Sequence, residues 1–105
     1  MKPFIDIPGA SGSVYRFQRI GGPARLPATA GNFIFMRSGP DGDEVVCCGM
    51  ARSLMLADAA WKSAVEQHQA TSIFIRLNIS RLIRTAEHDD LVAKQKPILV
   101  VTDPG

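Results

Sequence analysis

Hydrophobic residues follow two spacings along this chain, and the spacing near its middle predicts a β-hairpin. Residues 32–37, Asn-Phe-Ile-Phe-Met-Arg, are rich in the aromatic and apolar side chains that strands prefer. Residues 44–48, Glu-Val-Val-Cys-Cys, have the same character. Between them, residues 39–43, Gly-Pro-Asp-Gly-Asp, are a strong turn signal. Residues 32–49 are therefore predicted to form two paired strands.

Residues 54–68 change to a helical spacing. Apolar positions recur there every three or four residues, which places them on one face of a helix. These positions are Leu54, Ala57, Trp61, Ala64, Val65 and His68. At the end of such a stripe, His68 is expected to be an edge packing residue and not a ligand.

Residues 72–78 return to strand character. The segment Ser-Ile-Phe-Ile-Arg-Leu-Asn is apolar on both sides through Phe74. A strand covered on both faces is usually central in its sheet, so we expect this strand to be an inner one.

A second helix is predicted after that strand. Asn78 or Ser80 can cap its first turn, and the helix runs to about Lys96 because Pro97 stops it. Residues 98–101, Ile-Leu-Val-Val, then predict a short final strand or a packed tail.

The beginning of the chain is less regular. Proline and glycine are frequent in residues 1–13, which we expect to be a mostly irregular lead-in. Residues 14–20 alternate loosely and predict a strand, which Gly21-Gly22-Pro23 ends. We therefore divide the chain into a lead-in, residues 1–25, and a main domain, residues 26–105. The fold class is α+β, with helices lying against a small mixed or antiparallel sheet.

The second helix has an unusual distribution of charge. At about 100° per residue, one arc is apolar and the opposite side is polar. The apolar arc holds Ile79, Leu82, Ile83 and Ala86, and the polar side holds Arg81, Arg84, His88 and Gln95. Asp90 falls inside the apolar arc and Glu87 on its flank. A carboxylate that points towards a core needs a partner, so we expect a solvent-exposed edge, a salt bridge with Arg84 or Lys94, or a cation at Glu87.

The composition of the chain limits its possible ligands and its cellular location. Twelve Lys and Arg against ten Asp and Glu give a net charge of +2, which implies nucleic acid only if the basic residues gather on one face. The adjacent Cys47 and Cys48 cannot form an ordinary disulfide. Two reduced thiols, with no apparent leader or membrane span, favour the cytoplasm and no membrane partner. His68 and His88 lack zinc-finger spacing, so no metal or other cofactor is expected.

The order strand, turn, strand, helix, strand, helix resembles the GIY-YIG endonuclease domain over about residues 26–100. Three segments carry the resemblance: Gly31-Asn32-Phe33 at the first tripeptide, Cys47-Cys48-Gly49 at the second, and residues 84–91 with 96–99 at the closing helix. The resemblance implies a small three-stranded sheet, with one or two accessory strands, flanked by helices in the order β-β-α-β-α. It also implies that Glu87 stands where the family has its metal-binding glutamate.

The departures from the family pattern concern its catalytic groups. Phe33 and Cys47 replace the tyrosines that the family carries in its two tripeptides, and Tyr15 lies outside the matched region. The family also has an arginine on its first helix that supports the phosphate. The nearest basic residues here are Arg52, which comes too early in the sequence for that position, and Lys62, which comes rather late. The vestigial-site candidates are Phe33, Cys47, Gly49, Arg52 and Glu87. Phosphodiester cleavage needs a positioned nucleophile, charge stabilisation and usually a metal, and losing several such groups together predicts no nuclease activity.

We therefore expect a catalytically inactive GIY-YIG-like domain that binds nucleic acid or protein, with a role in DNA metabolism. The nucleic-acid-binding candidates are Arg37, Arg52, Lys62 and Arg84. One alternative is a divergent, metal-dependent, structure-specific endonuclease that uses Glu87 with Mg²⁺ or Mn²⁺. Another is a homo-oligomeric interaction protein that pairs through a sheet edge, with residues 14–20 as the candidate strand. A third is an enzyme with Cys47 or Cys48 as nucleophile.

Overall fold

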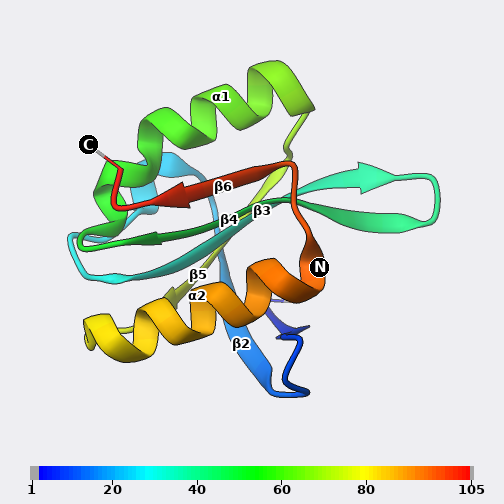
Figure 1. Cartoon of the computed structure of the whole chain (residues 1–105). Coiled ribbons are helices and arrows are strands. Elements are labelled where there is room, and N and C mark those ends of the chain that lie inside the picture. The colour runs from blue at the N-terminus through cyan, green and yellow to red at the C-terminus, as the bar shows by residue number, and fades with distance from the viewer. Residues whose placement is uncertain (1–2, 105) are drawn as a thin grey trace.

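The structure, a computed structural model, describes residues 3–104 and contains one mixed sheet with two α-helices (Figure 1). The elements in chain order are β1 (Phe4–Pro8), β2 (Val14–Ile20), the 3₁₀ turn η1 (Pro23–Arg25), β3 (Gly31–Gly39), β4 (Gly42–Ala51), the 3₁₀ turn η2 (Leu54–Ala57), α1 (Asp58–His68), β5 (Ser72–Leu77), α2 (Arg81–Gln95) and β6 (Leu99–Thr102). The predicted α+β class is confirmed.

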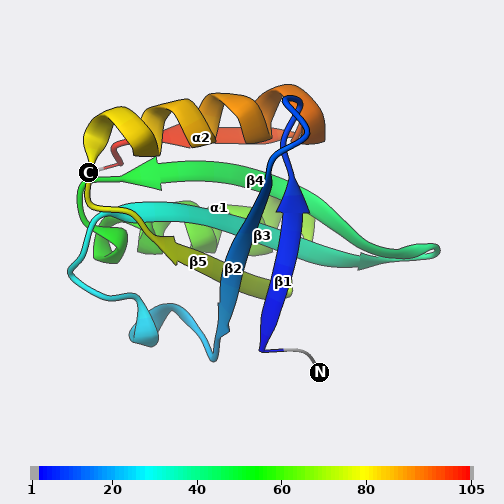
Figure 2. The same cartoon turned by 90° about the horizontal axis from the view of Figure 1, so that it is seen from below.

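The sheet is larger than predicted. Its six strands have the order β1-β2-β5-β3-β4-β6, and all neighbours are antiparallel except β4 and β6, which are parallel. The predicted three-stranded sheet is therefore wrong. The three expected strands, β5, β3 and β4, form its centre, and β2 with β1 extends it on one side while β6 extends it on the other. The helices lie on opposite faces, as Figures 1 and 2 show.

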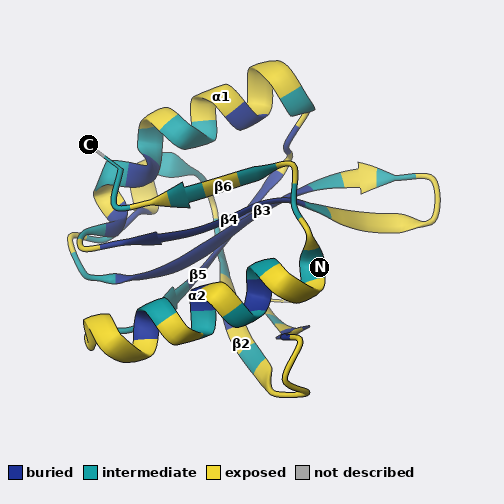
Figure 3. Ribbon diagram, in the orientation of Figure 1, coloured by how far each residue is buried: buried dark blue, intermediate teal, exposed yellow. Residues whose placement is uncertain are grey.

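The predicted hairpin is confirmed as β3 and β4. Their ladder runs from the pair Gly31 and Ala51 to the pair Gly39 and Gly42, with an irregularity between Phe35 and Met36. Gly42 has a φ of 118°, which only glycine adopts without strain. The turn end of this hairpin extends beyond the rest of the sheet and is exposed (Figure 3).

The two-residue period of the strands divides the core between the faces of the sheet. Phe33, Phe35 and Cys47 belong to the buried cluster under α1, and Cys48 belongs to the cluster under α2. The prediction that residues 72–78 form an inner strand is confirmed, because β5 lies between β2 and β3. A sheet covered on both faces explains the nearly continuous apolar runs in its central strands.

The start of the chain differs from the expectation of an irregular lead-in. Phe4–Pro8 form the edge strand β1, which pairs with β2 in an antiparallel register from Phe4 and Gln18 to Pro8 and Val14. The pattern was hard to recognise because the strand is short and ends in a proline, which an edge position tolerates. Strand β1 pairs with residues 14–18 and β5 with residues 18–20, so β2 lies inside the sheet and β1 takes the edge position that was expected for residues 14–20.

Helix α2 is turned the opposite way from the prediction. Arg84 and His88, which were assigned to the outer side, are buried with 3% of each residue exposed, and Leu91 is buried beside them. The residues assigned to the core are exposed instead, with Ile79 at 74%, Leu82 at 82% and Ile83 at 52%. Within residues 3–104, no helix is both long and apolar enough to cross a bilayer.

Candidate functional site

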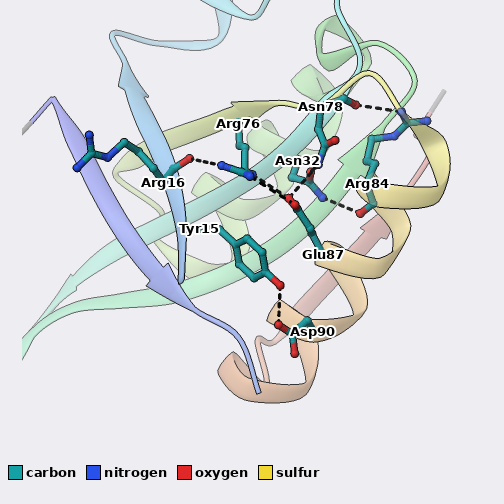
Figure 4. A network of polar contacts seen from close by, with 8 residues as sticks. All are labelled: Tyr15, Arg16, Asn32, Arg76, Asn78, Arg84, Glu87 and Asp90. Atoms are coloured by element: carbon teal, nitrogen blue, oxygen red, sulfur yellow. Dashed lines mark hydrogen bonds and ion pairs between the residues drawn. The ribbon is translucent and has the colours of Figure 1, made fainter. Parts of the chain in front are cut away.

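The inner side of α2 carries a network of polar contacts centred on Glu87 (Figure 4). Glu87 Oε1 accepts hydrogen bonds from Arg76 Nε at 2.8 Å and Asn78 Nδ2 at 2.9 Å, and Oε2 accepts from Arg76 Nη2 at 3.4 Å. Only 15% of the Glu87 side chain is exposed. The expected salt bridge is thus confirmed, but its partner is Arg76 on β5 and not Arg84 or Lys94.

Two asparagines link this ion pair to the start of α2. Asn32 on β3 is fully buried, and its Nδ2 donates to the backbone oxygen of Arg84 at 3.1 Å. Its Oδ1 accepts from Asn78 Nδ2 at 3.0 Å, so the Asn78 amide is shared between Asn32 and Glu87. Both the oxygen and the nitrogen of the buried Asn32 amide therefore have a specific partner, which fixes the position of the helix over β3 and β5.

Arg84 closes the network at the N-terminal end of α2. Its Nη1 donates to the backbone oxygens of Asn78 and Ile79, each at 3.1 Å. Its Nε is buried without a hydrogen-bond partner. Because this guanidinium is buried and holds the β5–α2 connection, a phosphate could reach it only if the helix moved. Arg84 was predicted to contact nucleic acid, but in this structure its guanidinium is buried inside the fold.

Asp90, in the C-terminal half of α2, binds the loop between β1 and β2. Its carboxylate accepts from Tyr15 Oη at 2.7 Å, Ser11 Oγ at 2.7 Å and Ser11 N at 2.8 Å. The bond from Tyr15, followed by those from Ser11, lowers the pKa of Asp90, and the same contact raises the pKa of Tyr15. Arg76 lies 5.5 Å from the Tyr15 ring and joins this cluster to the Glu87 network.

The vestigial-site candidates do not meet at one place. Phe33 and Cys47 are buried on the α1 face, whereas Glu87 lies under α2 on the other face. Gly49 sits opposite Phe33, whose ring fills the space where a side chain would stand. Arg52 follows the end of β4, and its backbone nitrogen donates to Asp103. A filled apolar junction therefore occupies the place where the two tripeptides meet.

The cysteines are packed within these two cores. Cys47 and Cys48 are free and buried. Burial raises the pKa of each thiol to about 12, with Cys48 adding a smaller charge effect on Cys47. A thiol nucleophile has to ionise near neutral pH, so their surroundings oppose the role of nucleophile.

The basic candidates are spread over the molecule. Arg37 pairs with Glu44 at 2.9 Å near the turn of the hairpin, and Lys62 pairs with Asp58 at 3.5 Å on α1. Arg52 lies beyond the opposite end of the hairpin. These positions do not combine into one basic face of the kind that phosphate binding requires.

Metal coordination has little support in the described part of the chain. Residues 3–104 contain no group of three or more His, Cys, Asp or Glu side chains placed to hold an ion. The carboxylate of Glu87 already accepts hydrogen bonds from Arg76 and Asn78. A cation at Glu87 would have to compete with a guanidinium that is already in place.

Sequence reasoning missed Asn32, Arg76 and Asn78 as partners of Glu87. One signal was present, because Arg76 interrupts a strand that was expected to be covered on both faces. A charge in such a strand requires an opposite charge nearby. Comparison of the chain with protein-family models, curated proteins and solved structures finds no significant match. The resemblance to the GIY-YIG domain therefore stays a prediction.

Proposed function

We propose that this chain is a non-catalytic protein-binding domain. The observation that carries the proposal is an exposed apolar cluster, which we call the outer arc of α2. It is made of Leu82, Ile83 and Ala86 on the helix, together with Ile79, which lies just before the N-cap residue Ser80. Three large aliphatic side chains of this arc are exposed within five residues of sequence, and Leu82 is 82% exposed. Figure 3 shows this exposure at the N-terminal end of α2. Clustered exposed apolar groups of this kind mark interaction surfaces.

The spacing of the outer arc favours an amphipathic helix of a partner protein as the occupant. Leu82, Ile83 and Ala86 are exposed side chains of α2 at positions i, i+1 and i+4, where they can meet the apolar stripe of another helix. Ala86, which is also exposed, is small enough to let a second helix approach closely. The network below the arc holds α2 rigidly, so little ordering is needed when the partner binds.

Two observations favour a domain without nuclease activity. Glu87 is neutralised by Arg76, and Phe33 with Cys47 lies across the sheet from it. A hydrolytic site needs its groups on one accessible surface. The basic residues Arg37, Arg52 and Lys62 are dispersed, so they support nucleic acid as a partner less well than the outer arc supports a protein partner.

The test uses Leu82→Asp, with Lys94→Asp as a matched control on the same exposed helix. Partners captured by the wild-type chain are compared with those captured by each variant, and each candidate is then purified and titrated. We expect binding to be weakened at least tenfold by Leu82→Asp and retained by Lys94→Asp, with unchanged thermal unfolding for both. Equal binding by Leu82→Asp would overturn the proposal. Cleavage of branched DNA with Mn²⁺ that is lost in Glu87→Ala would overturn its non-catalytic part.

A further inference from the structure

The two edges of the sheet differ in how they are protected against pairing. Strand β1 is flanked by Pro3, ends in Pro8 and carries Asp6, which pairs with Arg16 at 3.3 Å. Prolines and charges of this kind discourage the addition of another strand. Strand β6, at the other edge, reads Leu-Val-Val-Thr and contains no charge or proline.

Strand β6 also leaves apolar side chains uncovered. It pairs with β4 on one side only, from Cys47 and Leu99 to Met50 and Thr102. Among residues 3–104, no strand occupies its outer side. Val100 is 51% exposed, and Ile98, just before the strand, is 57% exposed. An unpaired backbone edge with apolar side chains is a template for strand addition.

We infer that β6 pairs in antiparallel orientation with β6 of a second copy of this chain. A register centred on Val100 places Val100 of one copy opposite Val100 of the other. The same register sets Ile98 opposite Thr102 and Leu99 opposite Val101. Directly opposed aliphatic and threonine side chains stabilise an antiparallel pair on both of its faces. The strand is therefore complementary to itself, and the two sheets join into one.

The charges at the ends of β6 favour the antiparallel orientation. Lys96 is exposed just before the strand, and Asp103 follows it. The Asp103 carboxylate already pairs with Arg81 at 3.4 Å and accepts from Arg52 N at 3.0 Å. Antiparallel pairing would therefore place Lys96 of each copy beside this ion pair, whereas parallel pairing would bring the two Lys96 ammonium groups together. The antiparallel arrangement is also two-fold symmetric, so it closes at two copies and does not extend into a filament.

The residues paired in this interface all belong to β6 or its flanks, and none of them belongs to the outer arc of α2. The inference is therefore independent of the proposed function. A strand of this length buries less area than a standard stable interface, so we expect a dissociation constant in the micromolar range.

Sedimentation velocity of the whole chain, at concentrations up to about 1 mM, tests the inference. Wild type is expected to shift from monomer to dimer, and so is Leu82→Asp, which changes only the outer arc. Val100→Lys should remain monomeric because the register places its lysine opposite itself, and Val100→Glu should do so for the same reason. An equimolar mixture of the two Val100 variants should recover the dimer through opposite charges.

Thermal unfolding checks that both Val100 variants fold, which we expect because the side chain is half-exposed. Two outcomes would sink the inference. One is a wild-type chain that stays monomeric throughout the concentration range. The other is a Val100→Lys variant that dimerises as strongly as wild type. Failure of the mixture to dimerise would reject the register centred on Val100.

Discussion

Phe33 and Gly49 face each other across the β3–β4 ladder, and the phenylalanine ring occupies the space above the glycine. A β-carbon at position 49 would collide with three atoms of that fully buried ring. Phe33 and Gly49, one from each of the two segments that resemble catalytic tripeptides, thus form a packing pair, in which one residue is small because the other is large.

Gly49→Ala should therefore destabilise the chain through overpacking. We expect a loss of about 1–3 kcal/mol in the free energy of unfolding, because the ring cannot move freely in a filled core. Urea denaturation measures this loss. Gly21→Ala is the control, since a β-carbon there meets no atom within 4 Å. Equal stability of Gly49→Ala and wild type would show that the ring adjusts.

Asn32 and Asn78 should behave as a coupled pair. Asn32→Ala removes the donor to the Arg84 oxygen and the acceptor of the Asn78 amide. We expect it to lower the free energy of unfolding by about 2 kcal/mol. A double-mutant cycle with Asn78→Ala measures the coupling, and the two losses should sum to more than the loss in the double variant. Strict additivity would mean that the bond between the two amides contributes nothing.

His88 should make stability depend on pH. Burial, slightly offset by Asp89, lowers the pKa of His88 from its ordinary value of 6.5, and its Nδ1 has no hydrogen-bond partner. Below pH 6.5 the unfolded chain binds a proton that the folded chain does not bind. The contribution of the neutral His88 to the free energy of unfolding is therefore fully present above pH 6.5, and it is lost as the pH drops below that value.

Denaturation at several pH values between about 5 and 8 measures this dependence. His88→Leu should flatten it, because the buried imidazole is then replaced by a side chain that does not titrate. Asp90 does not interfere in this range, because its pKa is lowered from 3.8 and its contribution is lost only in stronger acid. An unchanged slope in His88→Leu would assign the effect to another group.

Glu87 should act as an ion-pair partner and not as a metal ligand. Glu87→Ala leaves the Arg76 guanidinium in a partly buried place without its carboxylate. We expect a loss of about 1–3 kcal/mol in the free energy of unfolding. Mg²⁺ or Mn²⁺ at about 5 mM should not raise the melting temperature of wild type. A rise that disappears in Glu87→Ala, but persists in the exposed control Glu66→Ala, would restore the cation site.

Local patterns predicted most of the elements and their order. The hairpin predicted over residues 32–49 occupies residues 31–51, and the second helix, expected to end near Lys96, ends at Gln95. These elements depend on spacing and on turn or stop residues nearby in sequence. Strand β1 escaped prediction because it is short and lies between Pro3 and Pro8, which an edge position tolerates.

The orientation of α2 could not be obtained in the same way. A helical wheel shows which residues share a face, but it does not show which face meets the sheet. The orientation of α2 depends on hydrogen-bond partners that are distant in sequence. These are Asn32 for the Arg84 backbone, Arg76 for Glu87 and Tyr15 for Asp90. Their contacts turn a charged face inward and leave the aliphatic arc outside, against the usual preference.

The alternation of side chains in β4 gives the chain two internal reporters. Cys47 reaches the layer beneath α1 and Cys48 the layer beneath α2, although the two are adjacent in sequence. In Cys47→Ser and Cys48→Ser variants, the single remaining thiol is protected until its own layer opens. Alkylation rates in the two variants would therefore time the opening of each half of the molecule separately, and would reveal whether the halves come apart together or one after the other.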